Sequence, residues 1–391
     1  MIKKIPFAMA ACMCATQAAT AADPLWISQP ATNIATSSLT LDAVPALVSK
    51  RAAIPGIQAM LVAPEHLRML AQRSTHAHGP GFIVHGAFDD IALAESPTSY
   101  PGYEIDQHNI VQHLSAQIQE PRMAQVINQL TQLRTRRHDS DGGARAPGII
   151  AELWRGWSAH RTDVEVKLVS HVRTPQKSVE LTIKGSERPD EFIVLGGHLD
   201  SDAKGPVAPG ADDNASGIAS LSEALHVLLE NDFRPRRSLK FIAYAAEEFG
   251  LVGSGEIAAN HRESNIDVLG VMQLDMTNYK GSNEEIWIYE DFTDSRQNDF
   301  LRQLLTIYQP QLRVAASRCG YGCSDHESWT RYGYPASFPH EARMDQSNPY
   351  IHSAQDTIER SGSGTVHAAH FARLAVAYAV ELGNHTTRTG R

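Results

Sequence analysis

The chain has 391 residues, which is enough for one large domain or two modest ones. A hydrophobic content of 42% and a charged content of 20% are typical of a folded globular protein. Its 35 basic and 44 acidic residues leave a formal net charge of −9, which argues against a nucleic-acid partner. Beyond the N-terminus, no apolar run is long enough to cross a bilayer.

Residues 1–22 have the pattern of a secretory signal peptide. Lys3 and Lys4 precede the apolar stretch Ile5–Ala15, and small residues follow at Ala18–Ala22. A buried N-terminal helix is the alternative interpretation. The pattern predicts a secreted, extracellular protein (periplasmic in transit) that has no membrane association after the signal is cleaved.

Residues 23–104 contain short apolar runs separated by turns and carry no cluster of metal-type ligands. We expect a propeptide or a small accessory region here, with cleavage between Tyr100 and Ile105. Residues 105–385 form the expected catalytic domain, and residues 386–391 are predicted to be a frayed tail.

The catalytic region begins with helical spacing of apolar residues, and a further helix is predicted from Pro147 to His160 with the proline near its start. Apolar strands then alternate with amphipathic helices. This alternation predicts a single α/β domain, in which helices flank both faces of a mostly parallel mixed sheet.

The run Phe241–Ser254 reads as a strand that ends in two adjacent carboxylates, Glu247 and Glu248. Successive side chains of a strand point to opposite faces, so one carboxylate could bind a metal while the other moves protons. A polar cap on a buried strand is the alternative.

Four other motifs place potential ligands after predicted strands or before helices, where sites of α/β sheets assemble. Each has a structural alternative: a chance His-x-Asp pair, a helix N-cap, a turn former or a structural histidine. Together they supply two histidines and enough carboxylates for a two-zinc site with a bridging carboxylate. The residues are His198 with Asp200, Asp212 with Asp213, Asp275, and His352 followed by Asp356.

After signal cleavage the chain keeps two cysteines, Cys319 and Cys323. An even number of cysteines in an oxidising compartment favours a disulfide that closes the CGYGC loop. Metal ligation by these thiols is the alternative.

Six motifs in order resemble those of the secreted bacterial leucyl aminopeptidases, the co-catalytic dizinc type with a zinc-exopeptidase fold. They are GGHLDS, PGADDNASG, AAEEFGLVGS, QLDMTNYKGS, CGYGCSDHESW and IHSAQDT, and the resemblance spans about 105–382. It implies two Zn²⁺ ions per catalytic domain. The implied metal ligands are His198 and Asp275 for one zinc, Glu248 and His352 for the other, and Asp213 as the bridge.

The resemblance also implies roles beside the metals. Glu247 is the expected general acid/base, and Asp200 the partner that orients His198. Tyr321 is expected to face the tetrahedral intermediate. A cis peptide bond is expected after the bridging Asp213, and the two cysteines match the family's disulfide.

An apolar pocket for the substrate's first side chain is implied at Met276, Phe338 and Ile351. His340 and Met344 stand where the family has aromatic residues, and Ser347 where it has tyrosine. This departure bears on the strength of a leucine preference and not on the chemistry.

The expected protein is a secreted metallo-aminopeptidase, a monomer that hydrolyses the N-terminal bond of peptides with a free α-amine and an apolar first residue such as Leu. A zinc-activated bridging water would attack, with Glu247 moving the proton. The alternatives are a metallo-carboxypeptidase or amidohydrolase, which would need an arginine for the substrate carboxylate, and a glutaminyl cyclase with one zinc.

Overall fold

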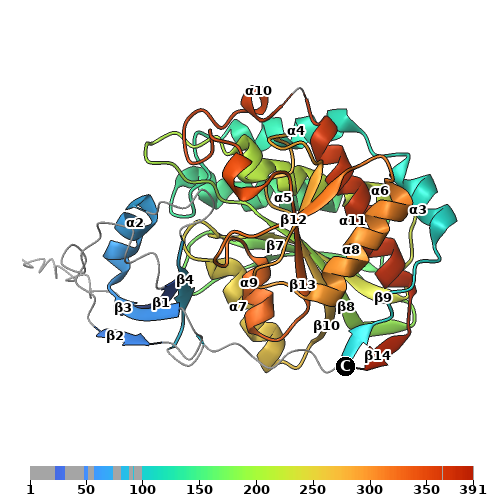
Figure 1. Cartoon of the computed structure of the whole chain (residues 1–391), viewed down its shortest axis with the longest axis horizontal. Coiled ribbons are helices and arrows are strands. Elements are labelled where there is room, and N and C mark those ends of the chain that lie inside the picture. The colour runs from blue at the N-terminus through green and yellow to red at the C-terminus, as the bar shows by residue number, and fades with distance from the viewer. Residues whose placement is uncertain are drawn as a thin grey trace, which may run out of the picture.

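The computed structural model describes residues 23–30, 48–51, 57–73, 81–87, 91, 99–362 and 364–390. The predicted signal peptide lies outside these residues and stays a prediction. Within the described part of the chain, no helix is both long enough and apolar enough to cross a bilayer. Figure 1 shows a large α/β body with a small sheet of N-terminal residues at its side.

An eight-stranded sheet forms the centre of the large body. Its strands are β6 (Val164–Val169), β7 (Ser178–Ile183), β8 (Arg188–His198), β9 (Arg237–Tyr244), β10 (Asp267–Gln273), β11 (Ile286–Tyr289), β12 (Val314–Ser317) and β13 (Ala336–His340). They lie in the order β12-β11-β13-β10-β8-β9-β7-β6. The neighbours β13, β10, β8 and β9 run parallel, as do β11 and β12, and the remaining pairs are antiparallel. The predicted mostly parallel mixed sheet is confirmed.

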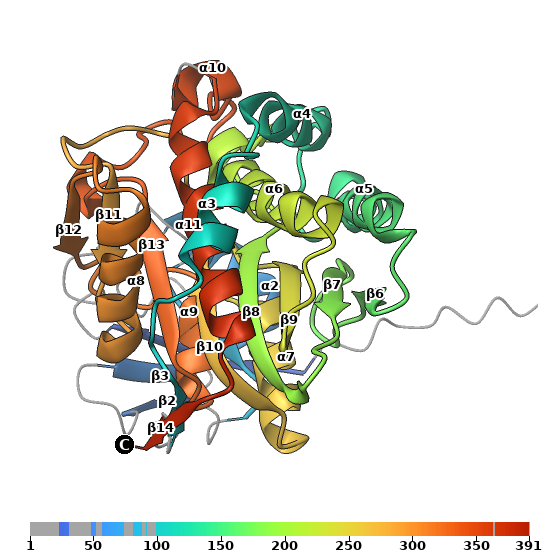
Figure 2. The same ribbon diagram turned by 90° about the vertical axis from the view of Figure 1, so that its right-hand side faces the viewer.

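Helices cover both faces of this sheet (Figure 2). They are α3 (His108–Ser115), α4 (Glu120–Thr131), α5 (Asp141–Ser158), α6 (Gly217–Glu230), α7 (Val252–Glu263), α8 (Ser295–Tyr308), α9 (His326–Arg331), α10 (Ile358–Ser361) and α11 (Val366–Asn384). Along β8, Ile193 and Leu195 join the apolar cluster with α6 and α11, whereas Val194 joins the cluster with α7 and α9. Because both faces of the sheet are buried, its central strands read as continuous apolar runs.

Helix α5 begins earlier than the sequence pattern predicts. It starts at Asp141, where Ser140 Oγ accepts a hydrogen bond from the Gly143 N–H at 3.0 Å. Pro147 therefore lies inside the helix, where it has no N–H for the carbonyl of Gly143. The Nε2 of Gln176 donates to that carbonyl at 3.1 Å instead, so a distant side chain replaces the missing helical hydrogen bond.

A second, antiparallel sheet is built from N-terminal residues. Its elements are β1 (Leu25–Pro30), β2 (Val48–Arg51), β3 (Ile57–Val62), β4 (Ile83–His85) and helix α2 (Pro64–Arg73), with strand order β2-β3-β1-β4. Leu67 and Val84 pack in an apolar cluster with Ala246 and Val252 of the large body. The Val84 N–H also donates to the Gly250 carbonyl at 3.0 Å, so this region contacts the segment after β9. Whether residues 23–104 are a propeptide stays a prediction.

The two ends of the large body pair with each other. Strands β5 (Ser99–Pro101) and β14 (Arg388–Gly390) form a two-stranded antiparallel sheet, seen in Figure 1 as a cyan strand beside the red β14. The Gly102 N–H extends the contact by donating to the Thr387 carbonyl at 2.9 Å. The predicted frayed tail is therefore wrong for 388–390, because the backbone of these residues hydrogen-bonds to a strand almost 290 residues earlier in the chain.

Candidate metal centre and active site

The candidate site residues converge at the carboxyl ends of the central strands, as expected for an α/β sheet. Five segments supply them: the end of β8 (His198), the turn before α6 (Asp213), the segment after β9 (Glu247 and Glu248), the segment after β10 (Asp275) and the loop before α10 (His352). Segments far apart in the chain thus form one site.

Asp213 lies between two groups of potential metal ligands. Its Oδ1 is 3.2 Å from His198 Nε2, which is also 3.2 Å from Asp275 Oδ1. Its Oδ2 is 3.1 Å from His352 Nε2, which is 3.0 Å from Glu248 Oε2. Within each group the ligand atoms lie within 4.8 Å of one another. One carboxylate shared by both groups is the arrangement that a bridging ligand requires.

The backbone around Asp213 is held by side chains that the sequence did not single out for this purpose. The Asp213–Asn214 peptide bond is cis, as the resemblance implied. Asp356 accepts hydrogen bonds from the N–H groups of Asp212 and Asp213 at 3.0 and 3.1 Å. The Oδ1 of Asn214 accepts from the Gly217 N–H at 2.9 Å. Asp356 follows His352 within one motif, but nothing in that motif signals backbone partners 143 and 144 residues earlier.

Asp200 contacts both His198 and the segment after β9. Its Oδ1 is 3.4 Å from Nδ1 of His198, the ring nitrogen that faces away from Asp213. The same carboxylate accepts hydrogen bonds from the N–H groups of Glu247 and Glu248, each at 3.0 Å. The approach to His198 was expected, whereas the contact with the glutamate backbone was not.

The two neighbouring glutamates have different surroundings. Both are almost fully buried. Glu248 lies against His352, whereas Oε1 of Glu247 has no hydrogen-bond partner among the described residues. Burial, together with the charge of Glu248, raises the pKa of Glu247 well above its usual range. Burial also raises the pKa of Glu248 to about 7. A buried carboxyl group with a raised pKa and an unused oxygen is suited to proton transfer.

The site has a surplus of negative groups. Burial disfavours a charged imidazole at His198, but the carboxylates of Asp275 and Glu247 outweigh it and raise the pKa of His198 well above its usual range. At His352, Glu248 and Asp213 likewise outweigh burial and raise the pKa. Because these carboxylates stabilise the positively charged form of both histidines, the site favours the binding of cations.

Asp275 has a further partner that the sequence analysis missed. Ser324 donates its hydroxyl to Asp275 Oδ2 at 2.6 Å, and Gln273 Nε2 donates to the Ser324 oxygen at 3.0 Å. The Oδ1 atom of Asp275 therefore contacts His198, while its Oδ2 atom accepts the hydrogen bond from Ser324. Ser324 directly follows the second cysteine of CGYGC, but its residue type alone does not reveal this contact.

Cys319 and Cys323 form a disulfide, as predicted. Tyr321, inside the closed loop, is buried in an apolar cluster with Trp287 and Phe338. It also borders a small cavity that residues of the N-terminal sheet line from the other side. None of these contacts tests whether the Tyr321 hydroxyl faces the tetrahedral intermediate. That role therefore stays a proposal.

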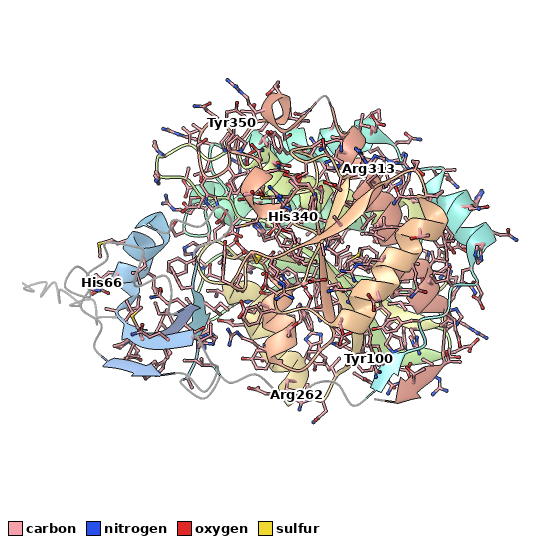
Figure 3. The ribbon with its side chains drawn as sticks, viewed as in Figure 1. His66, Tyr100, Arg262, Arg313, His340 and Tyr350 are labelled. Atoms are coloured by element: carbon pink, nitrogen blue, oxygen red, sulfur yellow. A yellow bond between two sulfur atoms is a disulfide. The ribbon has the colours of Figure 1, made fainter. Side chains whose placement is uncertain are left out.

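Two of the three expected pocket residues adjoin candidate ligands in the chain. Met276 is buried directly after Asp275, Ile351 is partly exposed directly before His352, and Phe338 is buried in β13. His340, buried in the interior (Figure 3), packs edge-on against Phe338 with ring centroids 5.4 Å apart. Burial lowers the pKa of His340 to about 4, so a neutral imidazole takes the place of an aromatic ring at neutral pH.

The donor set of the two groups fits zinc. It consists of imidazole nitrogens and carboxylate oxygens. The described cysteines, Cys319 and Cys323, form the disulfide and so offer no thiolate ligand. Zinc accepts this mixture of ligands. The shared Asp213, the excess of buried carboxylates and the orienting contacts of Asp200 and Ser324 are the features expected around metal ligands.

Comparison with known proteins decides the family. Residues 178–378 match the model of peptidase family M28, which is slightly more than half of the chain. The chain belongs to peptidase family M28.

Relatives of this M28 peptidase cover most of its length. A probable aminopeptidase of Saccharomyces cerevisiae is 31% identical over 306 residues, which are 74% of this chain and 81% of that protein. Leucine aminopeptidase 1 of Blastomyces gilchristii is 30% identical over 309 residues, which are 74% of this chain and 78% of that protein.

Solved structures agree with these relatives. The LapA aminopeptidase of Legionella pneumophila has a TM-score of 0.81 at 27% identity, over 93% of this chain and 99% of that one. LapB of the same organism has a TM-score of 0.78 at 27% identity, over 92% and 100%. The predicted zinc-exopeptidase fold and the prediction of an aminopeptidase, a hydrolase of the exopeptidase class, are confirmed.

Proposed function

We propose that this M28 peptidase is a secreted aminopeptidase with two zinc ions, which removes apolar residues such as Leu from peptides with a free α-amine. The position of Asp213 between two ligand groups is the observation that carries the proposal. In the proposed site, His198 and Asp275 would hold one zinc, Glu248 and His352 would hold the other, and Asp213 would be shared between the two groups.

Glu247 is the proposed general acid/base. When bound, zinc supplies Lewis-acid chemistry, since it polarises a carbonyl and lowers the pKa of water toward about 7. Glu247 takes the proton of the attacking water and passes it to the leaving amine. Its unused oxygen, its raised pKa and the Asp200 contact to its backbone support this role. Tyr321 is the proposed donor to the oxyanion.

Substrate selection follows from charge and shape. The surplus of carboxylates in the site favours a substrate that carries a positive α-ammonium group. Met276, Phe338 and Ile351 are the proposed apolar walls for the first side chain. Because His340 brings a neutral but polar ring to this region, we expect the leucine preference to be moderate.

Arg136 bears on the carboxypeptidase alternative. It lies close enough to the site for its charge to act on Asp213. Its Nε and Nη2 donate to the carbonyls of Leu199 and Gly210, each at 2.8 Å, and Nη1 donates to the carbonyl of Pro209. Since the Arg136 side chain is fully buried and each of its three nitrogens already donates to a backbone carbonyl, this guanidinium is not available to bind a substrate carboxylate. Arg136 is therefore not the arginine that the carboxypeptidase alternative needs.

The N-terminal region is the proposed inhibitory propeptide. Its apolar packing and the Val84 hydrogen bond both reach the segment that carries Glu247 and Glu248. A cavity between the start of α2 and Glu248 is lined by Pro64 and Glu65. A region so placed restricts access to the site until it is removed.

The test compares leucine p-nitroanilide with its N-acetylated form, before and after chelation and after zinc is added back. We expect p-nitroaniline to be released only from the substrate with a free amine. Chelation should abolish this activity, and added zinc should restore it. No metal-dependent release from any free-amine substrate would reject the aminopeptidase. Cyclisation of N-terminal glutamine with one zinc per chain would favour a glutaminyl cyclase instead.

A further inference from the structure

A third group of metal-type side chains lies where the two ends of the large body meet. Asp106, just before α3, and Glu381 and His385, at the end of α11, supply three atoms within 4.8 Å of one another. In the described part of the chain only three groups have this spacing, and the other two form the candidate active site. The third group shares no residue with them.

The buried imidazole of His385 is the first feature that points to a bound ion. Its side chain is nine-tenths buried, and Nε2 lies 3.0 Å from Asp106 Oδ1 and 3.8 Å from Glu381 Oε2. Nε2 makes no hydrogen bond, because the Asp106 contact lacks hydrogen-bond geometry and the Glu381 contact is too long. Two carboxylate oxygens and one imidazole nitrogen therefore lie within 4.8 Å of one another, with no hydrogen bond from Nε2 to either oxygen. That is how ligands are arranged around an ion.

The buried carboxylate of Glu381 is the second feature that points to a bound ion. Its side chain is fully buried, and among the described residues its one ion-pair partner is His385, with no lysine or arginine. The carboxylate accepts hydrogen bonds from the N–H groups of Asp106 at 3.1 Å and Gln107 at 3.2 Å, and from the hydroxyl of Tyr308. Buried carboxylates are usually paired with a cation or bound to a metal.

We propose that Asp106, Glu381 and His385 bind a divalent cation of the zinc class at a structural site separate from the active site. One imidazole nitrogen and two carboxylates suit zinc, with water completing the coordination, whereas calcium prefers oxygen ligands alone. Glu104 Oε2 lies 3.3 Å from His385 Nδ1. A carboxylate on the far ring nitrogen is the usual partner of a metal-binding histidine, since it directs the other nitrogen to the metal.

The ion would join the start of the large body to its end. Asp106 lies two residues before the start of α3, and His385 directly follows α11. Strand β5 ends a few residues before Asp106, and β14 begins a few residues after His385, so the β5–β14 pair lies beside this group in the chain. A cation here closes the same junction with metal–ligand bonds, so its expected effect is on stability and not on turnover.

Zinc content is the direct test, measured on the full-length protein by mass spectrometry after dialysis. The variants His385→Ala and Asp106→Asn should each bind one zinc ion fewer per chain than the wild type. Aminopeptidase turnover should stay within about twofold, because neither residue belongs to the catalytic site. The matched control is His113→Ala, an exposed histidine on α3, which should keep the wild-type zinc content. Equal zinc content in wild type and variants would overturn the proposal.

A thermal test separates a metal site from a simple ion pair. Zinc added to the metal-depleted wild type should raise Tm more than it does for His385→Ala, since an ion that binds only the folded state stabilises it. If only ion pairs were lost, Tm would fall equally with and without zinc, and the proposal would fail. A larger rise with calcium than with zinc would overturn the assignment of the metal class.

Discussion

The carboxylate of Asp200 accepts a hydrogen bond from the backbone N–H of Glu247 at 3.0 Å. Its other oxygen accepts from the next N–H, and the carboxylate also approaches the imidazole of His198. A single side chain thus connects the end of β8 to the segment that follows β9. The proposed general base and one proposed zinc ligand therefore depend on the same residue.

We expect Asp200→Asn to impair both proton transfer by Glu247 and zinc binding by His198. An asparagine has one acceptor oxygen for two backbone donors, and its NH₂ group would face the other N–H or the histidine ring. Loss of such a supporting contact typically costs about 10–100-fold in metal affinity or activity. We expect kcat/KM and zinc affinity to fall together by this amount, measured by p-nitroanilide kinetics and zinc titration. Asp190→Asn, an exposed change on the same strand, is the control. Unchanged zinc affinity would show that Asp200 does not support His198.

Glu247→Gln should retain both zinc ions and lose turnover. Glutamine keeps the size of the side chain but cannot take up a proton, and a positioned base contributes about 10²–10⁴-fold. We expect kcat to fall by that range at unchanged metal content. The control is Glu248→Gln, which should lose zinc because it removes a proposed ligand. Near-normal turnover of the Glu247 variant would reject its role as the base.

Leu67→Asp should activate the unprocessed chain. Leu67 is fully buried in the cluster that joins the N-terminal sheet to the large body. Truncating a buried leucine already costs about 2–5 kcal/mol, enough to shift a docking equilibrium tenfold or more, and a buried charge adds to this.

The measurement is kcat/KM of the full-length variant against that of full-length wild type. An inhibitory propeptide predicts a higher value for Leu67→Asp. Leu168→Asp, on the exposed side of β6, is the control and should change little. If activity and Tm fall together in the Leu67 variant, the N-terminal region supports the active fold and does not restrain it.

Asp163→Asn should make the protein less stable at neutral pH but not at low pH. Arg161 donates to Asp163 through Nε and Nη2 at 2.8 and 2.7 Å. This pairing lowers the pKa of Asp163 to about 2. The stabilisation is present above the ordinary aspartate pKa near 3.9 and is lost as the pH falls toward 2.

Since Asp163 is partly exposed, solvent screening reduces the effect to about 1 kcal/mol. Thermal melts between pH 7 and pH 2 should show a Tm about 2 °C below wild type at pH 7, with the gap closing between about pH 4 and pH 2. The exposed pair of Asp299 and Arg302 offers a control in Asp299→Asn. A constant gap across this range would mean that the charge of Asp163 does not contribute.

The convergence of the site residues could be predicted because parallel strands bring their carboxyl ends to one edge of a sheet. Glu247, Asp275 and His198 each follow an apolar run that the sequence marks as a strand. The contacts of Asp356 and Ser324 were not predicted, because their partners are backbone N–H groups or a single carboxylate oxygen far away in the chain. Such contacts leave no periodic pattern.

Strand β13 shows where local rules mislead. Its sequence, ASFPH, contains Pro339, which argues against a strand in the interior of a sheet. The pairing of β13 with β10 covers only Ala336 and Ser337, whereas Pro339 lies opposite Ile288 of β11. The proline is tolerated because the parallel partner has already ended there.

The β5–β14 pair sets the limits of any shortened chain. A version that begins at Ile105 keeps every candidate zinc ligand, yet it removes the strand on which Arg388–Gly390 depends. Start and end points should therefore be chosen together, from Ser99 to Gly390. Because these two points are held side by side, a short linker should join them and allow new termini to be opened elsewhere, as in a circular permutant.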